Sequence, residues 1–172
     1  MKKKTKTTTA IIRLSKQRMI YDIANNAFVV GETIEDAGPH IRHLVQDVVE
    51  GQNIDRVCRV MSLAFCRVKD LLRQWVVDVE ETGCSLSTHQ NAGEEEYVLR
   101  IVVPYGLPPC TIDYWVILAY EYVTASAIAD WLGITAKDKA PEWQRKADEA
   151  AERLFKGVSL CHRHARKRME VV

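Results

Sequence analysis

Residues 53–75 read NIDRVCRVMSLAFCRVKDLLRQW, and their pattern indicates the architecture of the chain. Apolar residues recur there at alternating steps of three and four, as in a helix that packs lengthwise along another helix. This stripe consists of Ile54, Val57, Met61, Ala64, Val68, Leu71 and Trp75, and Asn53 precedes it as a natural N-cap. We therefore predict a helix whose stripe from Val57 to Leu71 is buried against a neighbouring helix.

Three further segments have helical periodicity. They are residues 15–29, residues 112–132 and a segment that begins near Pro141, and a short helical turn is expected within residues 41–49. Thr111 and Gly133 suit the two cap positions of the 112–132 helix. This helix carries few charges, so we expect it to be the central and most buried one.

The segment between the second and third helices has the character of a strand. Residues 96–103 read EYVLRIVV, which is rich in β-branched and aromatic residues, and Pro104 ends the run. CSLST at residues 84–88 would pair with it across the turn-like HQNAGEE. The sequence thus predicts a mainly α fold: a four-helix bundle-like domain, residues 10–172, with one β-hairpin near residues 84–103 inserted between helices two and three.

Size and composition are typical of one folded domain. The chain has 172 residues, of which 47% are hydrophobic and 27% charged. Its longest strongly apolar stretch, residues 114–120, is too short to span a membrane, and Arg13 and Lys16 argue against a secretory signal. The five cysteines form no CxxC, so we expect buried thiols without a disulfide and a cytosolic protein.

The net charge of +1 conceals two basic ends and an acidic middle. Residues 21–154 carry 12 basic and 22 acidic residues, a net charge of −10. We expect residues 1–9 to form a flexible basic arm. The candidate interaction residues at the two ends are Lys2, Lys3, Lys4, Lys6, Arg163, Arg166, Lys167 and Arg168. No aromatic residue is interleaved with them, so non-specific contact with DNA phosphates and contact with acidic protein surfaces explain them equally well.

No catalytic motif is present. The sequence contains no GxGxxG, GxxxxGK[ST], GxSxG or HExxH. His40 and His43 have helical i, i+3 spacing, and Cys161, His162 and His164 are also ligand types, but no second cluster completes a metal site. We therefore expect no enzymatic activity, no metal and no cofactor.

Three other features have a plain and a functional interpretation. Glu94, Glu95 and Glu96 are interpreted as a solvated loop, since acid–base catalysis requires a desolvated carboxyl group. Asp130 is a candidate partly buried acid, and its plain interpretation is an end-of-helix residue or an ion-pair partner. Trp131 lies beside the core stripe, and besides a core position it is a candidate exposed anchor at a subunit contact, where tryptophan is enriched.

Several segments together resemble a known group of proteins. They are AYEYVTASAIADWLGIT (residues 119–135), APEWQRKADEAAERLFKGV (140–158) and RHARKR (163–168), with QDVVEGQNIDRVCRV (46–60) and VLRIVVP (98–104) fitting the same pattern. This combination, over residues 44–168, resembles small structural proteins encoded among phage and prophage morphogenesis genes. The helical build is similar to the head-to-tail connector (neck adaptor) proteins of tailed phages.

The resemblance implies a virion component that is made in the bacterial host cytoplasm. It implies a homo-oligomeric ring whose partners are copies of itself and the portal and tail proteins, with no membrane involved. A tail-completion or tail-terminator protein is the alternative within the virion. A small DNA-binding or packaging accessory protein is the alternative from another class, and no individual residue roles follow from the resemblance.

Overall fold

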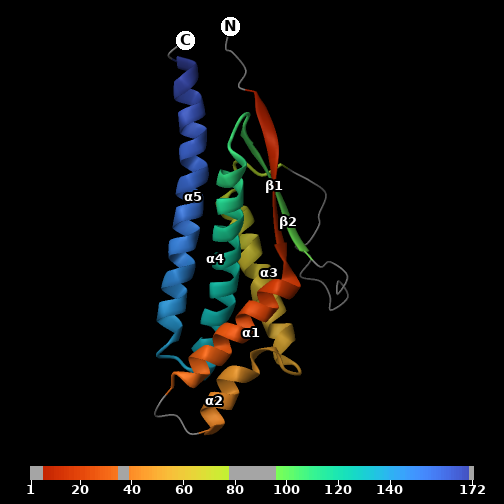
Figure 1. The fold of residues 1–172 in the computed structure, drawn as a ribbon, viewed down its shortest axis with the longest axis vertical. Helices are drawn as coiled ribbons and strands as arrows, with labels where there is room; N and C mark the ends of the chain where they lie inside the picture. Colours follow the sequence, from red (N-terminus) through yellow and green to blue (C-terminus); the bar gives the residue numbers. More distant parts are fainter. Residues whose placement is uncertain (1–5, 35–38, 78–95, 171–172) are drawn as a thin grey trace.

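The computed structural model describes residues 6–34, 39–77 and 96–170, which are mainly helical. In chain order they form the strand β1 (Thr7–Ser15), the helices α1 (Lys16–Glu32) and α2 (Pro39–Gln46), the 3-10 turn η1 (Asp47–Val49), the helix α3 (Asn53–Leu71), the strand β2 (Glu96–Pro104) and the helices α4 (Pro109–Thr135) and α5 (Ala140–Glu170). The long helices α4 and α5 run side by side along the long axis of the molecule (Figure 1).

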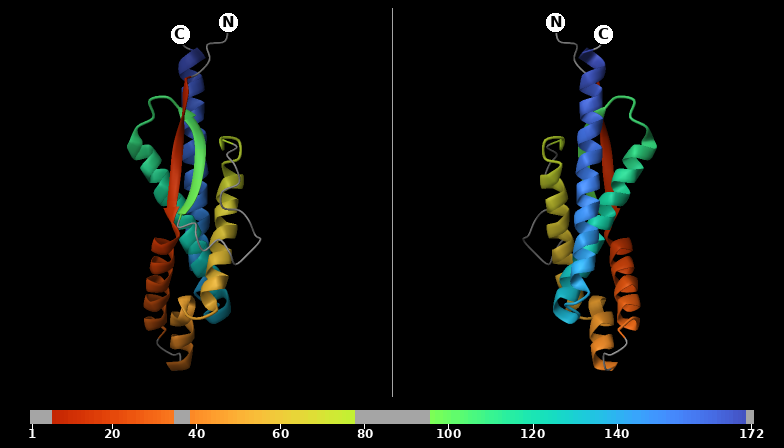
Figure 2. Two further views of the ribbon diagram at one scale, coloured as in Figure 1. Left: turned by 90° about the vertical axis from the view of Figure 1, so that its right-hand side faces the viewer. Right: turned by 90° about the vertical axis from the view of Figure 1, so that its left-hand side faces the viewer.

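The helix α4 is the centre of the fold, as its low charge predicts. It packs against α5 along much of its length and also contacts α1, α3 and β1 (Figure 2). Because neighbours surround it, α4 buries residues on several sides, among them Trp115, Leu118, Ala119, Val123 and Ile128. The charge-poor sequence of this helix therefore reflects its position in the core.

The helix α3 follows the predicted register with one shift at its end. Val57, Met61, Ala64 and Val68 are buried, but Leu71 is only half-buried and Leu72 takes its place in the core. Asn53 is the first helical residue and not the N-cap, a position that Gln52 occupies. Its side-chain amide instead donates to the carbonyl oxygen of Asp47 at 2.8 Å and ties η1 to α3.

The sheet corrects the predicted topology. The strand at residues 96–103 is confirmed, but its partner is β1 in antiparallel register from Thr7 opposite Pro104 to Ser15 opposite Glu96. The proposed partner, residues 84–88, lies outside the described residues. On its other side β2 bonds to residues 75–77, where the Val102 amide donates to the Trp75 carbonyl at 2.7 Å.

The sequence of β1 explains why this segment becomes a strand. TTTAIIRLS is rich in β-branched residues, and Ala10, Ile12 and Leu14 alternate with exposed residues so that one face is buried. The prediction of a flexible arm over residues 1–9 is therefore corrected for Thr7–Thr9, which are paired with β2. Residues 1–5 lie outside the described residues.

Two helix boundaries also differ from the prediction. The helix α4 begins at Pro109, a residue type that suits the first turn, so Thr111 does not cap it. The helix continues through Gly133 to Thr135, whose hydroxyl donates to the Trp131 carbonyl at 3.0 Å. The start of α5 at Ala140, next to Pro141, agrees with the prediction.

A glycine of α5 accommodates a large side chain of α4. A Cβ atom at Gly157 of α5 would lie 2.9 Å from Nε1 of Trp115 on α4, closer than real Cβ contacts come. Trp115 is 1% exposed. The absent side chain at position 157 thus makes room for the indole in the helix interface.

The cysteines differ from the prediction in one respect. Cys58, Cys110 and Cys161 have free thiols, whereas Cys66 on α3 is disulfide-bonded. The prediction of no disulfide is therefore wrong. A disulfide requires two Cα atoms about 4.4–6.8 Å apart, and this proximity comes from the fold and not from sequence spacing. Burial raises the pKa of the Cys58 and Cys161 thiols.

Candidate functional site

The described elements next to the two basic ends of the sequence lie at the same end of the molecule (Figure 1). The start of β1 and the C-terminal end of α5 lie together there in both views (Figure 1, Figure 2). Lys6 and Arg163 are exposed. Arg166, Lys167 and Arg168 belong to the last turns of α5, where the structure describes the backbone, and Lys2, Lys3 and Lys4 lie outside the described residues.

Trp131 is a core residue and not an exposed anchor. Its side chain is 7% exposed, and its Nε1–H donates to the carbonyl oxygen of Val45 at 2.9 Å. This bond joins α4 to α2 across 86 positions of the sequence. The interpretation of Trp131 as an exposed anchor is therefore wrong for the single subunit. Its position beside the apolar stripe faces α2 and not solvent.

Of the other candidate residues, Asp130 forms an ion pair, and the two histidines of α2 are exposed. Asp130 accepts a hydrogen bond from Nε of Arg56 at 2.9 Å, which agrees with its interpretation as an ion-pair residue. His40 and His43 on α2 are exposed. Within residues 6–34, 39–77 and 96–170, no three His, Cys, Asp or Glu side chains are grouped so that they could hold a metal ion. Nor does any helix in these ranges have the length and apolar character needed to cross a membrane.

A pocket of about 400 Å³ opens between α1, α4 and α5, and we call it the α1–α5 pocket. The helix α1 contributes Asp22 and Asn26 to it. The remaining lining residues come from α4 (Tyr120, Glu121, Thr124 and Ala125) and from α5 (Trp143, Lys146, Glu149, Ala150 and Arg153). No sequence motif marks these residues as a site, because three separate helices bring them together.

The Tyr120 hydroxyl donates a hydrogen bond to Oδ2 of Asp22 and joins α4 to α1. Burial is the main cause that raises the pKa of Tyr120, and the bond to Asp22 and its negative charge raise it further. The phenol therefore stays protonated at neutral pH and remains a donor. The Asn26 side chain donates to the Asp22 carbonyl oxygen at 2.7 Å. This bond within α1 fixes the orientation of the Asn26 side chain at the pocket.

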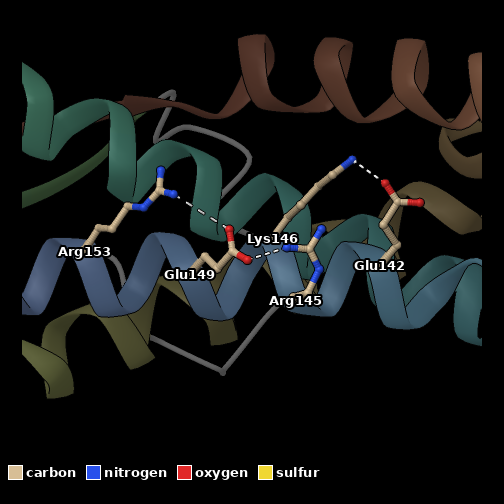
Figure 3. Close-up of polar contacts among 5 residues, drawn as sticks. All are labelled: Glu142, Arg145, Lys146, Glu149 and Arg153. Carbon is tan, nitrogen blue, oxygen red and sulfur yellow. Dashed lines mark hydrogen bonds and ion pairs between the residues drawn. The ribbon is translucent and has the colours of Figure 1, made fainter.

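The cations of the pocket are already paired along α5 (Figure 3). Lys146 contacts Glu142 at 3.1 Å and lies over the ring of Trp143, 4.2 Å from its centroid. Arg153 contacts Glu149 at 3.9 Å, and Glu149 is also bonded to Arg145. The hydrogen bond from Lys146 lowers the pKa of Glu142. These exposed i, i+4 pairs add little stability but fix the charge pattern on this face.

Two polar groups of the pocket have no partner among the described residues. Glu121 is exposed and forms no ion pair or hydrogen bond there, whereas Asp22 and Glu149 are engaged. The Thr124 hydroxyl is buried, with the residue 7% exposed, and has no hydrogen-bond partner there. The groups left unused in the pocket are therefore a carboxylate and a hydroxyl, which both accept hydrogen bonds.

The outer edge of β1 is a second candidate site. Because the amide of Val102 and the carbonyl of Arg100 bond to residues 75–77, the backbone of these two residues faces away from β1. The register then directs Ala10 and Ile12 of β1 toward β2. The intervening residues Thr7, Thr9, Ile11 and Arg13 direct their N–H and C=O groups outward, and we call these groups the outer edge of β1.

The outer edge has no backbone partner in the described ranges. Natural sheets usually protect such an edge with proline, a bulge, a charge or a covering element. This edge carries one charged residue, Arg13, which pairs with Glu96 at 3.3 Å on the exposed face. Unpaired N–H and C=O groups of this kind are the groups through which a strand bonds another extended segment. No protein-family model, curated protein or solved structure matches this chain.

Proposed function

We propose that this chain is a structural subunit without catalytic activity that acts by packing against copies of itself. The observation that carries the proposal is the outer edge of β1. Its four outward-facing residues each offer an N–H and a C=O group to an extended segment of a neighbouring copy.

Exposed apolar side chains next to this edge support the same function. Ile11 on β1 is 39% exposed, and Tyr105 follows β2, where its amide donates to the Lys6 carbonyl at 2.9 Å. Tyr114 and Ile117 are exposed on the N-terminal half of α4, the helix that packs on β1. Apolar and aromatic residues beside unpaired backbone are suited to burial at a subunit contact.

The charge distribution favours another copy of the chain over an unrelated partner. The ends of the sequence are basic and residues 21–154 have a net charge of −10, so each copy carries both complementary surfaces. A head-to-tail contact of this kind forms a ring when its rotation closes. Together with the resemblance of residues 44–168, this leads us to propose a head-to-tail connector ring in the neck of a tailed phage. Tail completion and tail termination are the alternatives in the same virion.

The test compares two substitutions at Ile11. Ile11→Pro removes one outward N–H without removing a bond to β2, and proline is tolerated on sheet edges. Ile11→Thr changes the side chain but keeps the N–H. We expect the natural chain and Ile11→Thr to self-associate with rising concentration in sedimentation velocity or mass photometry. Ile11→Pro is expected to stay monomeric with an unchanged far-UV circular dichroism spectrum.

Two results would contradict the proposal. One is a natural chain that stays monomeric over the whole concentration range. The other is an Ile11→Pro variant that associates as strongly as Ile11→Thr, which would mean that the outer edge does not form the contact.

The shared basic end supports a second candidate function, contact with nucleic-acid phosphates. Lys6, directly before β1, and Arg163, on the C-terminal part of α5, are exposed, and six further basic residues lie near them in sequence. A polyanion neutralised by these residues would show binding that falls steeply with salt. Titration of a labelled DNA fragment at several salt concentrations tests this, with the double variant Lys6→Gln/Arg163→Gln expected to lower the salt slope by about 1–2. A slope that does not change would argue against this function.

A further inference from the structure

The α1–α5 pocket has a surplus of acceptors over donors. Its two cations are engaged, Lys146 by Glu142 and Arg153 by Glu149. In the part of the chain that the structure describes, the pocket groups without a partner are the Glu121 carboxylate and the buried Thr124 hydroxyl. A buried hydroxyl without a partner is uncommon in native proteins and indicates that a partner is supplied from outside the subunit.

The aromatic residues of the pocket point to the same ligand chemistry. Tyr120 and Trp143 line it on opposite helices, α4 and α5. Aromatic faces attract ammonium and guanidinium groups, and Lys146 already lies over the Trp143 ring. A free carboxylate, a free hydroxyl and two aromatic rings together are typical of a site for a cationic side chain.

We propose that the α1–α5 pocket binds a lysine side chain from residues 2–4 of a neighbouring copy. This inference rests on the proposed function, since it assumes that copies of the chain meet. Glu121 would pair with the ammonium group, and Thr124 would accept or donate a hydrogen bond at the floor of the pocket. The proposal gives the basic residues before β1 a defined acceptor on the acidic part of the next subunit.

The strand β1 lies between the N-terminal residues of a subunit and Asp22 at its own pocket. The nine residues of β1 run down the molecule from Thr7 to Ser15, a length of about 30 Å. Asp22 lies about two helical turns further along α1. Residues 1–5 extend at most about 18 Å along the backbone. A lysine of a neighbouring copy would not have to span the length of β1 to enter the pocket.

The experiment titrates the full-length protein, at a concentration where it is monomeric, with a fluorescent peptide MKKKTK, which corresponds to residues 1–6. The same peptide with glutamine in place of each lysine is the peptide control. Glu121→Gln removes the unpaired carboxylate of the pocket. Asp113→Asn is the matched protein control, because Asp113 is also an exposed acid on α4 but does not line the pocket.

We expect saturable binding of the lysine peptide and none of the glutamine peptide, measured by fluorescence anisotropy. Glu121→Gln should weaken binding about two- to fivefold, the range of one exposed ion pair, while Asp113→Asn leaves it unchanged. Equal weakening by both substitutions, an unaffected Glu121→Gln variant or no binding to the natural chain would overturn the inference.

The outcome is separable from that of the proposed function. If the protein assembles but does not bind the peptide, the pocket inference fails and the subunit function stands. If the peptide binds through Glu121 while the protein stays monomeric at all concentrations, the pocket is a cation site and the assembly function fails.

Discussion

Thr124 shows how a single residue in the core can lower the stability of the protein. Its hydroxyl is buried without a partner among the described residues, and such a group costs about 1–3 kcal/mol in desolvation. Thr124→Val keeps the branched shape and removes the hydroxyl. We expect the free energy of unfolding to rise by about 1 kcal/mol in urea denaturation.

Thr135→Val is the matched control for this substitution. The Thr135 hydroxyl donates to the Trp131 carbonyl at 3.0 Å, so its removal loses a hydrogen bond and should bring no gain in stability. If both variants gain equally, the effect comes from the valine side chain and not from the unpartnered hydroxyl of Thr124.

Tyr120 makes the stability sensitive to alkaline pH. Burial and Asp22 raise its pKa in the folded state above the value of about 10 that tyrosine has in an unfolded chain. The folded state therefore disfavours the phenolate, and this contribution to stability is complete below pH 10 and is lost as the pH rises above it. Tyr97, whose pKa burial also raises, contributes in the same direction.

We expect Tyr120→Phe to lose less stability than the natural chain between about pH 9 and pH 11.5 in thermal melts. Tyr114→Phe, an exposed tyrosine on the same helix, serves as the control and should follow the natural chain. A Tyr120→Phe variant whose melting temperature falls as steeply as that of Tyr114→Phe would show that Tyr120 does not titrate differently on unfolding.

At the scale of elements, the α4–α5 interface depends on Gly157. Gly157→Ala would place a Cβ atom against the Trp115 indole, and overpacking of this kind costs about 1–3 kcal/mol. The gain in helix propensity of about 1 kcal/mol offsets only part of it. We expect a net loss of stability of about 1 kcal/mol by chemical denaturation.

Gly133→Ala separates packing from propensity. Nothing lies within 4 Å of a Cβ atom at position 133, which is also helical, so alanine there should stabilise by about 0.5–1 kcal/mol. Stabilisation by both alanines would mean that α5 can shift away from Trp115 at no cost.

The helices were predictable from the sequence and the pairing of the sheet was not. The apolar periodicity of α3 correctly predicted which residues are buried, because the buried face of a helix recurs every three to four residues. These residues are Val57, Met61, Ala64 and Val68. The partner of β2 lies at residues 7–15, and no local signal links two strands that distant. The turn-like HQNAGEE next to residues 96–103 predicted a local hairpin with residues 84–88 instead.

The α1–α5 pocket could not be predicted from the sequence either, because no local signal links its distant residues. Asp22 and Tyr120 are 98 positions apart and meet only after α1 has packed on α4. Trp131 was ambiguous because its place beside the apolar stripe fits either a partner protein or a further helix of the same chain. The contact with Val45 on α2 decides between them within the subunit.

At the scale of the whole molecule, a deletion that tests the basic N-terminal segment has to stop before β1. Residues 7–9 belong to β1, so a deletion of residues 1–9 would remove part of the sheet. Deletion of residues 1–5 leaves every described element intact. We expect this truncated chain to keep its melting temperature but to self-associate more weakly.

The deficit should be largest at low salt, because salt screens the contacts of the lysines in the full chain. Sedimentation velocity across a salt series measures this directly. Equal association of the truncated and full chains at every salt concentration would show that the segment has no part in assembly.

The pairing of β1 with β2 also has a consequence during synthesis on the ribosome. β1 ends at Ser15 and β2 begins at Glu96, so the second strand is made about 80 residues after the first. At about 5–20 residues per second, β1 waits roughly 4 to 16 seconds for its partner. Both edges of TTTAIIRLS are unpaired in this interval, and nascent chains on neighbouring ribosomes of one messenger RNA carry the same exposed strand at the same time.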